Sequence, residues 1–271
     1  IAAAVTPRTK CILPVHYAGH PCDMDPIMEL ATDNKLYVVE DAAHSLPARY
    51  RGRTIGTIGD MTAFSFYATK NLTTAEGGML TGSPELIDEA RIISLHGMSR
   101  DAWRRYEKGG SWYYEVVLPG FKYNMTDIQA SIGLQQLKKL NSFQDRRRAA
   151  VRHYNDAFSQ YPYFETPPQH PDVDHAWHLY ALRLNLDTLR IDRAQFIEEL
   201  KARNIGSSVH FIPIHVHPYY AKKYGYKAGD FPVAYSNYMR LMSLPLHPRL
   251  DDQDVADVIE AVVDVAQTFK R

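Results

Sequence analysis

The alternation of short apolar runs with helical patterns, over roughly the first 150 residues, constrains the fold of this chain most. Four runs are typical of buried strands: KCILPVHYAG, LYVVEDAAHS, TAFSFYA and GGMLTG. The segments DPIMELATDN and SPELIDEARIISLHG are typical of helices, with Asp25 and Ser83 as N-caps and a proline after each. This order predicts an α/β domain with a mixed, mostly parallel sheet that helices cover on both faces.

A long helix then leads into a second domain. Thr126 and Gln129 form a capping-box pattern, and the helical spacing of apolar residues continues to about Phe158. Beyond a proline-rich stretch, strands are predicted in HAWHLYALRLNL and SSVHFIPIH, and helices in IDRAQFIEELKARNIG and DDQDVADVIEAVVDVAQTFK. We therefore expect a large domain over residues 1–150 and a smaller α+β domain over residues 151–271.

Composition argues for a globular protein and against a nucleic-acid partner. The 271 residues include 31 Lys plus Arg and 31 Asp plus Glu, so the formal net charge is zero and little attracts a polyanion. No apolar run reaches the ~20 residues of a membrane-spanning helix, so no membrane contact is expected. Cys11 and Cys22 form no CxxC pair, and we expect both to be buried, reduced thiols of a cytoplasmic protein.

Two charged residues follow predicted strands where each run becomes polar. Asp41 ends LYVVED, and Lys70 lies where FSFYATKNLTTAEGG turns from apolar to polar. Taken alone, Asp41 is better explained as an N-cap, and Lys70 as a lysine whose stem lies along an apolar edge. Ligands of open α/β sheets bind at the carboxyl ends of the strands, however, where both residues are expected. A lysine partly removed from water there has a lowered pKa and becomes a nucleophile.

An aspartate and a lysine at two strand ends together match the requirements of pyridoxal 5′-phosphate (PLP). The carboxylate keeps the pyridine nitrogen of the cofactor protonated, while the lysine binds the aldehyde as a Schiff base and later moves the proton. We therefore predict that Asp41 and Lys70 hold PLP, with the hydroxyl of Ser65 available to its phosphate.

The motifs around these residues resemble one family. VVEDAAHS, GTIGDMTAFSFYATKNLTTAEGGML, LHGMSRDAW and PGFKYNMTDIQASIGLQQLKKL are similar in order and spacing to the DegT-type nucleotide-sugar aminotransferases of PLP fold type I. The resemblance extends through HAWHLY, SSVHFIPIHVHPYY and SLPLHPRLDDQDV, so it covers practically the whole chain. It implies a three-layer large domain, a smaller C-terminal domain and a homodimer with shared active sites.

The resemblance also assigns roles to individual residues. It implies that Lys70 forms the Schiff base, that Asp41 binds the pyridine nitrogen and that Ser65 contacts the phosphate. His44 matches a position, usually Gln or His, that contacts the cofactor ring and its 3-hydroxyl, although a structural histidine fits equally well. In GFKYNM, Asn124 is the expected contact to the phosphate site of the partner subunit. Lys122 is the second choice, because many members have Asn at the position of Lys122 and Arg at that of Asn124.

Two differences from the family bear on activity. A dehydratase branch has histidine in place of the lysine, so Lys70 favours transamination. Members also carry an N-terminal segment before the position matched by Ile1, with a Ser-Gly-Thr phosphate loop, a residue that stacks on the ring and part of the sheet. This sequence contains none of it. Either the sequence is truncated or the chain is a fragment that cannot build a complete site alone, and we expect truncation.

Substrate contacts are predicted from residue type. A nucleotide-sugar pocket favours aromatic rings and neutral donors. The candidates are Tyr106, Trp112, His178, His210, His215 and Tyr220. No metal site is expected in HVHPYY, because His215 and His217 would point to opposite sides of an extended segment and no third ligand is evident.

The predicted reaction moves an amino group from an amino acid, expected to be glutamate, to a nucleotide-linked keto sugar and leaves 2-oxoglutarate. The likeness of KYNMTDIQA and LHGMSRDAW to members that make 4-amino sugars for bacterial surface glycans, such as the O-antigen of lipopolysaccharide, favours carbon 4. Two alternatives remain open. One is an aminotransferase for a 3-keto sugar on the same scaffold, and the other is a non-catalytic, regulatory PLP-binding relative or an inactive fragment.

Overall fold

A computed structural model describes residues 1–99 and 113–271 of the chain. The chain divides into two compact units, of which unit 1 contains residues 1–140 and 172–176, and unit 2 contains residues 141–171 and 177–271. The division falls inside one long helix, α4 (Asp127–Phe158), somewhat before the boundary expected at residue 150.

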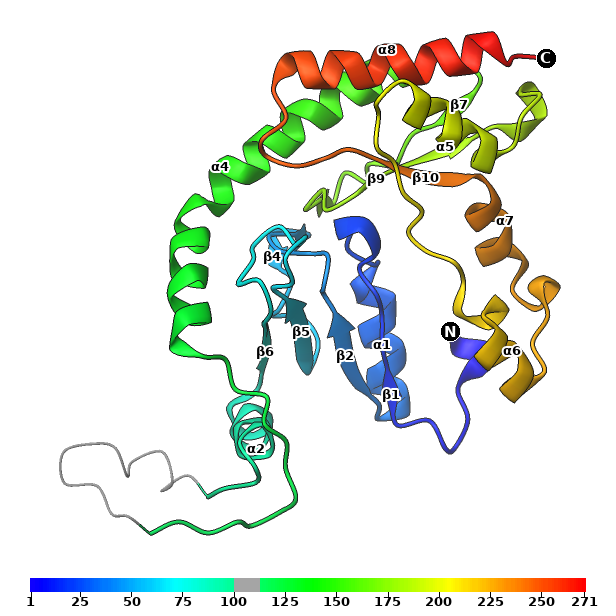
Figure 1. Cartoon of the computed structure of the whole chain (residues 1–271). Helices are drawn as coiled ribbons and strands as arrows, with labels where there is room; N and C mark the ends of the chain where they lie inside the picture. Colours follow the sequence, from blue (N-terminus) through cyan, green and yellow to red (C-terminus); the bar gives the residue numbers. More distant parts are fainter. Residues whose placement is uncertain (100–112) are drawn as a thin grey trace. The chain divides into compact units, whose positions relative to one another are not determined.

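Unit 1 is built on a four-stranded sheet with the strand order β1-β2-β5-β6. Its strands are β1 (Cys11–Ile12), β2 (Tyr37–Asp41), β5 (Met61–Ser65) and β6 (Gly78–Gly82). β1, β2 and β5 are parallel, and β6 is antiparallel to β5. The helix α1 (Met24–Asn34) packs on β1 and β2, and α2 (Pro84–Ser94) packs on β6 (Figure 1). The prediction of an α/β unit with a mixed, mostly parallel sheet is confirmed.

Shorter elements complete unit 1. A second sheet has the order β4-β3-β8, with β3 at Arg49–Tyr50, β4 at Arg53–Thr54 and β8 at Val173–Asp174. Two short 3-10 helices are η1 (Ala2–Ala4) and η2 (Tyr17–Gly19). Because β8 pairs with β3, residues 172–176 belong to unit 1 although they follow α4 in the sequence.

The start of α1 differs from the prediction. The helix begins at Met24 with Asp23 as N-cap, so Asp25 and Pro26 lie inside the first turn. A proline is tolerated there because the first N–H groups of a helix have no partner within it. The Asp23 carboxylate accepts a hydrogen bond from the Tyr50 hydroxyl instead of capping the helix. This long-range contact is invisible in the local pattern.

Two apolar cores support the sheet of unit 1. The larger one lies between α1 and the sheet and includes Met24 and Tyr50. A smaller one joins Phe66 and Leu72, in the loop after β5, to Leu140 of α4. The loop after β5 is therefore attached to the unit by its apolar side chains.

Unit 2 contains a three-stranded antiparallel sheet with the order β10-β9-β7, covered by helices. Its strands are β7 (Phe164–Glu165), β9 (Tyr180–Leu184) and β10 (Leu241–Leu244). Its helices, besides the second half of α4, are α5 (Arg193–Ala202), α6 (Pro218–Tyr224), α7 (Pro232–Arg240) and α8 (Asp252–Thr268). Three 3-10 turns are η3 (Leu186–Thr188), η4 (Ile214–Val216) and η5 (Ala228–Asp230). Aromatic residues such as Tyr154, Phe158, Tyr180 and Phe196 form its core.

Helix starts are predicted better than strands in this half of the chain. The Thr126–Gln129 capping box is confirmed, with the Gln129 N–H donating to Thr126 Oγ1 at 3.3 Å. In HAWHLYALRLNL only the second part is a strand. The strand predicted in SSVHFIPIH is wrong: Ser208 forms an isolated bridge with Ser243, and the last two residues of the segment belong to η4. β10 was not predicted, because all four of its residues are buried and no alternation marks it.

Two further observations concern the chemistry of the chain. Cys11 is exposed and Cys22 partly exposed, so the expectation of two buried thiols is wrong, and both are free. Among the described residues, no helix combines the length and the apolar character that a membrane span requires.

Candidate functional site

β2 and β5 bring two predicted site residues to one edge of the sheet of unit 1. Asp41 is the last residue of β2 and Ser65 the last residue of β5. The two strands are parallel, with Asp41 paired to Ala63. Lys70 lies in the loop that follows Ser65. The carboxyl ends of parallel strands are the usual position of a ligand in such sheets.

The charge of Asp41 acts on the Lys70 amine. Burial lowers the pKa of Lys70 below its ordinary value of 10.5, and the negative charge of Asp41 opposes this shift. Among the residues that the structure describes, no hydrogen bond engages the Lys70 amine. A partly buried amine with a lowered pKa loses its proton more easily, and the unprotonated form attacks a carbonyl carbon.

The Asp41 carboxylate projects from a fixed backbone. Its Oδ1 accepts the N–H of Ala43 at 3.0 Å, and within the described chain no hydrogen bond reaches Oδ2. The Asp41 N–H donates to the carbonyl of Pro14 at 2.9 Å, and its own carbonyl accepts the N–H of His16 at 3.0 Å. One carboxylate oxygen is thus oriented by the chain, and the other is left for a ligand.

The loop that carries Lys70 is closed at its base. The Phe66 N–H donates to the Gly77 carbonyl at 2.8 Å. Gly77 has a φ of 151°, and a Cβ atom there would lie 2.4 Å from Thr74 Oγ1, so only glycine fits. Asn71 is buried and donates from Nδ2 to the Ala176 carbonyl at 2.7 Å. These contacts hold the lysine relative to the sheet.

His44 lies just after β2 and accepts a hydrogen bond from the same unit. Its Nδ1 accepts the N–H of Ala18 at 3.2 Å, and its ring centroid lies 6.4 Å from that of Tyr17. Because Nδ1 accepts, the neutral ring carries its proton on Nε2. This geometry suits both a contact to the cofactor's 3-hydroxyl and a structural role, so the assignment of His44 stays a prediction.

The GFKYNM segment lies near the loop after β5 of its own chain. Met125 packs with Phe66, and the Lys122 amine donates to Asn124 Oδ1. Asn124 Nδ2 also donates to the Met125 carbonyl at 3.4 Å. The assignment of Asn124 to the partner subunit's phosphate site stays a prediction.

The predicted substrate residues fall into two groups. Tyr106 and Trp112 lie outside the described residues. The other candidates belong to unit 2, and they are His178, His210, His215 and Tyr220. Their placement in a separate unit from the aspartate and the lysine leaves their role in substrate binding a prediction.

Two of the histidines in unit 2 have contacts of their own. His215 is buried, with its ring centroid 4.8 Å from that of Phe231, and His210 Nδ1 lies 2.8 Å from Ser243 Oγ. Tyr220 is 38% exposed and is therefore accessible to a ligand. Within the described ranges, no cluster of three or more His, Cys, Asp or Glu could hold a metal ion.

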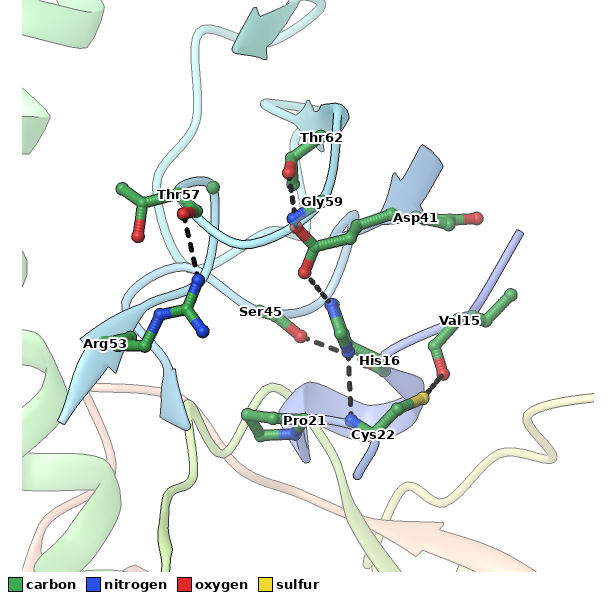
Figure 2. Close-up of polar contacts among 12 residues, drawn as sticks. Val15, His16, Pro21, Cys22, Asp41, Ser45, Arg53, Thr57, Gly59 and Thr62 are labelled. Carbon is green, nitrogen blue, oxygen red and sulfur yellow. Dashed lines mark hydrogen bonds and ion pairs between the residues drawn. The ribbon is translucent and has the colours of Figure 1, made fainter. Parts of the chain in front are cut away.

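Two buried charged groups were not singled out in the sequence. His16 Nε2 lies 2.8 Å from Glu40 Oε2, and both side chains are fully buried. Figure 2 draws this contact as a dashed line from the His16 ring. The strand pattern contained a signal, because Glu40 alternates with Val38 on the buried face of β2, and a buried carboxylate needs a partner. The other group is Arg147 of α4, which nothing in a surface-like run of three arginines distinguishes.

The residues at this edge of unit 1 fit PLP. Lys70 offers an amine with a lowered pKa, Asp41 a carboxylate oxygen without a hydrogen bond in the described chain, and Ser65 a hydroxyl at the end of the next strand. A PLP enzyme needs an amine for the aldehyde, an anion for the ring nitrogen and donors for the phosphate. The donor set therefore matches the group.

Comparison with known proteins identifies the family. The model of the DegT/DnrJ/EryC1/StrS aminotransferase family matches residues 1–263. The chain is 57% identical over 263 residues to an uncharacterized protein of Methanocaldococcus jannaschii, covering 97% of this chain and 68% of that protein. It is 55% identical over 269 residues to the spore coat polysaccharide biosynthesis protein SpsC of Bacillus subtilis, covering 98% of this chain and 69% of SpsC.

A solved structure supports the same conclusion. The putative sugar aminotransferase Spr1654 of Streptococcus pneumoniae, in its PMP form, matches with a TM-score of 0.90 at 34% identity. The match covers 98% of this chain and 72% of that chain, and Spr1654 is also known in a PLP form. The predictions of fold type I and of PLP as cofactor are confirmed. The chain belongs to the DegT/DnrJ/EryC1/StrS family of PLP-dependent aminotransferases.

Proposed function

We propose that this enzyme moves an amino group from glutamate to carbon 4 of a nucleotide-linked keto sugar, in the biosynthesis of a bacterial surface glycan. One observation carries the proposal: the Lys70 amine has a pKa lowered by burial and lies within electrostatic reach of Asp41, at the carboxyl edge of β2 and β5. The names of two relatives, a putative sugar aminotransferase and a spore coat polysaccharide biosynthesis protein, support a sugar substrate.

Each site residue has a task in this proposal. Lys70 would hold the aldehyde of the cofactor, and its amine would remove and return the proton at the α-carbon of the amino acid. Asp41 keeps the ring nitrogen protonated, Ser65 donates to the phosphate, and His44 donates from Nε2 to the 3-hydroxyl oxygen. When bound, PLP supplies the electron sink that makes this proton removable.

The proposal assigns the two units different tasks. Unit 1 carries the PLP-binding site, and unit 2 is the small C-terminal domain. The described candidates for contacts to the nucleotide sugar lie in unit 2, and they are His178, His210, His215 and Tyr220. The protein works in the cytoplasm as a homodimer, in which the partner's Asn124 completes each phosphate site.

A substrate panel tests the proposed function. The holoenzyme is incubated with glutamate and a set of UDP- and dTDP-linked 4-keto and 3-keto sugars, and the product mass is followed. We expect a mass change that corresponds to replacement of one keto oxygen by an amino group, and NMR of the product then locates the amine. Amination at carbon 3 would favour the 3-keto sugar alternative, while a PLP-saturated protein that aminates no sugar would exclude both.

Mixing two inactive variants tests the shared site. In a homodimer with shared sites, combining Lys70→Ala with Asn124→Ala restores one complete site in each mixed dimer. We expect partial recovery of activity after the variants are mixed and allowed to exchange subunits. If the mixture stays inactive while native mass spectrometry shows mixed dimers, each chain contributes both residues to its own site.

A further inference from the structure

We propose that the buried pair of His16 and Glu40 is a positioning unit for the cofactor site, which fixes the segment from Asp41 to Ser45 against the end of β1. The inference rests on the proposed function, because Asp41 and His44 lie in that segment. His16 and Glu40 touch no reacting group and act through the residues that do. Figure 2 shows dashed contacts from His16 to Cys22 and to Ser45. The His16 ring also bonds to Glu40, the residue before Asp41 on β2.

The Glu40 carboxylate is held on both oxygens. Oε2 lies 2.8 Å from His16 Nε2, and Oε1 accepts the Gly59 N–H at 2.8 Å and the Thr62 hydroxyl at 2.7 Å. A Cβ atom at Gly59 would lie 3.2 Å from Oε1, so the glycine lets the backbone approach the carboxylate. Burial raises the pKa of Glu40, but these hydrogen bonds outweigh it and lower the pKa, so the group is a carboxylate at neutral pH.

Four groups of His16 make hydrogen bonds. In the ring, Nδ1 accepts the Cys22 N–H at 3.0 Å, so Nδ1 carries no proton and Nε2 donates to Glu40. On the backbone, the His16 N–H donates to the Asp41 carbonyl at 3.0 Å, and the His16 carbonyl accepts the Ser45 hydroxyl at 3.1 Å. One histidine therefore bonds to three of the six positions from Glu40 to Ser45.

The same histidine begins the turn that contacts His44. His16 precedes η2, in which Ala18 has a φ of 58° and donates its N–H to His44 Nδ1 at 3.2 Å. This donation keeps the proton of the neutral His44 ring on Nε2. A shift of His16 would therefore displace the Asp41 carboxylate and also remove the contact that orients His44.

A buried carboxylate is a costly way to obtain stability, because its charge must be taken out of water. Replacing buried polar partners by apolar residues of the same shape can be nearly neutral or stabilising. What the pair supplies is geometry: a carboxylate with three donors and a ring with two partners allow one arrangement of the strand ends. Groups that bind a reacting cofactor need such support to keep their positions.

The experiment compares four variants of the holoenzyme. His16→Leu removes the donor to Glu40, His16→Gln keeps an amide donor at the position of Nε2, and Thr62→Val removes one donor with little change of shape. Tyr50→Phe is the control, because it removes another hydrogen bond of unit 1, from a buried tyrosine to Asp23. Three quantities are measured: the melting temperature, the PLP dissociation constant of the cofactor-free protein, and the pH midpoint of the visible absorption band.

We expect His16→Leu to weaken PLP binding about tenfold or more, which is what loss of a supporting partner costs at metal sites. The pH midpoint of the visible absorption band should shift, because a displaced Asp41 carboxylate no longer keeps the pyridine nitrogen of the cofactor protonated. His16→Gln should restore most of both properties, and Thr62→Val should show a smaller change in the same direction. Tyr50→Phe should lower the melting temperature and leave both cofactor readouts at the wild-type values.

Two outcomes would overturn the inference. One is that the His16 and Thr62 variants lose melting temperature but keep the wild-type dissociation constant and pH midpoint. The other is that Tyr50→Phe changes the PLP dissociation constant and the pH midpoint as much as the His16 and Thr62 variants do. If His16→Leu fails to fold, the PLP dissociation constants and pH midpoints of Thr62→Val and His16→Gln test the inference in its place. A wild-type protein without a borohydride-sensitive visible band would refute the proposed roles of Lys70 and Asp41 instead.

Discussion

Two cations removed from water, one in each unit, show how similar charges acquire different uses. Arg147 of unit 2 is buried, and its Nη1 donates to the carbonyls of Trp177, His178 and Leu246 at 3.0, 3.4 and 2.8 Å. Lys70 of unit 1 is partly buried, and among the described residues its amine makes no hydrogen bond. Burial lowers the pKa of both groups, that of Arg147 to about 10.

The difference lies in what the surroundings offer. Backbone carbonyls stabilise the charged guanidinium, which at a pKa of about 10 keeps its proton at neutral pH and serves the structure. Among the described residues, only the through-space effect of Asp41 helps the lysine to keep its proton. An amine in that state is available for chemistry.

The largest expected effect comes from removing the reactive cation. Lys70→Ala should reduce transamination by about 10³-fold or more and abolish the visible band that borohydride bleaches. Lys70→Arg should do the same, because a guanidinium does not lose its proton. The measurements are kcat/KM and the absorption spectrum. Lys201→Ala, at an exposed lysine of α5, is the control, and a bleachable band in Lys70→Ala would contradict the assignment.

The structural cation should affect stability rather than chemistry. Arg147→Ala leaves three carbonyls without their donor, and we expect a loss of about 3 kcal/mol in the free energy of unfolding. Denaturant unfolding measures it, with Arg152→Ala, at an exposed position of the same helix, expected to change stability by less than about 0.5 kcal/mol. If Arg147→Ala and Arg152→Ala lower the free energy of unfolding equally, the hydrogen bonds of Arg147 do not account for the loss.

The influence of Asp41 on the reactive lysine is smaller and has a definite sign. The Asp41 charge raises the pKa of Lys70 against the lowering by burial. Asp41→Asn should therefore lower that pKa further, so that Lys70 reacts at lower pH. The measurement is the pH profile of amine labelling in the cofactor-free protein, read by mass spectrometry, with a wild-type midpoint expected below 10.5.

A matched substitution separates this effect from a general change of charge. Glu76→Gln removes an exposed carboxylate from the same loop and should leave the labelling midpoint of Lys70 unchanged. A midpoint that rises in Asp41→Asn, or that falls equally in both variants, would contradict a direct influence of Asp41.

The smallest expected effect concerns the phosphate. Ser65→Ala removes one neutral hydrogen-bond donor, worth about 1 kcal/mol, so PLP binding should weaken about fivefold. The dissociation constant of the cofactor-free protein gives the result, and Ser131→Ala on α4 serves as the control. An unchanged dissociation constant in Ser65→Ala would remove this residue from the phosphate site.

The predictions from sequence succeeded where local contacts decide the structure. The cap at Ser83 and the capping box at Thr126 are confirmed, because both are made within four residues. The start of α1 was predicted wrongly, since the Asp23 carboxylate bonds to Tyr50, 27 residues away. The same limit explains the missed strand β10, whose partner β9 lies in a distant part of the sequence.

The sequence by itself determined Lys70, Asp41 and PLP as candidates, because residue types at the ends of strands carry that information. The family followed from the resemblance of the surrounding motifs. Only the tertiary structure decided which charges are buried and what they contact. The partners of His16, Glu40 and Arg147 come from other segments, and burial makes their contacts matter, since a charge out of water needs partners that folding alone brings to it.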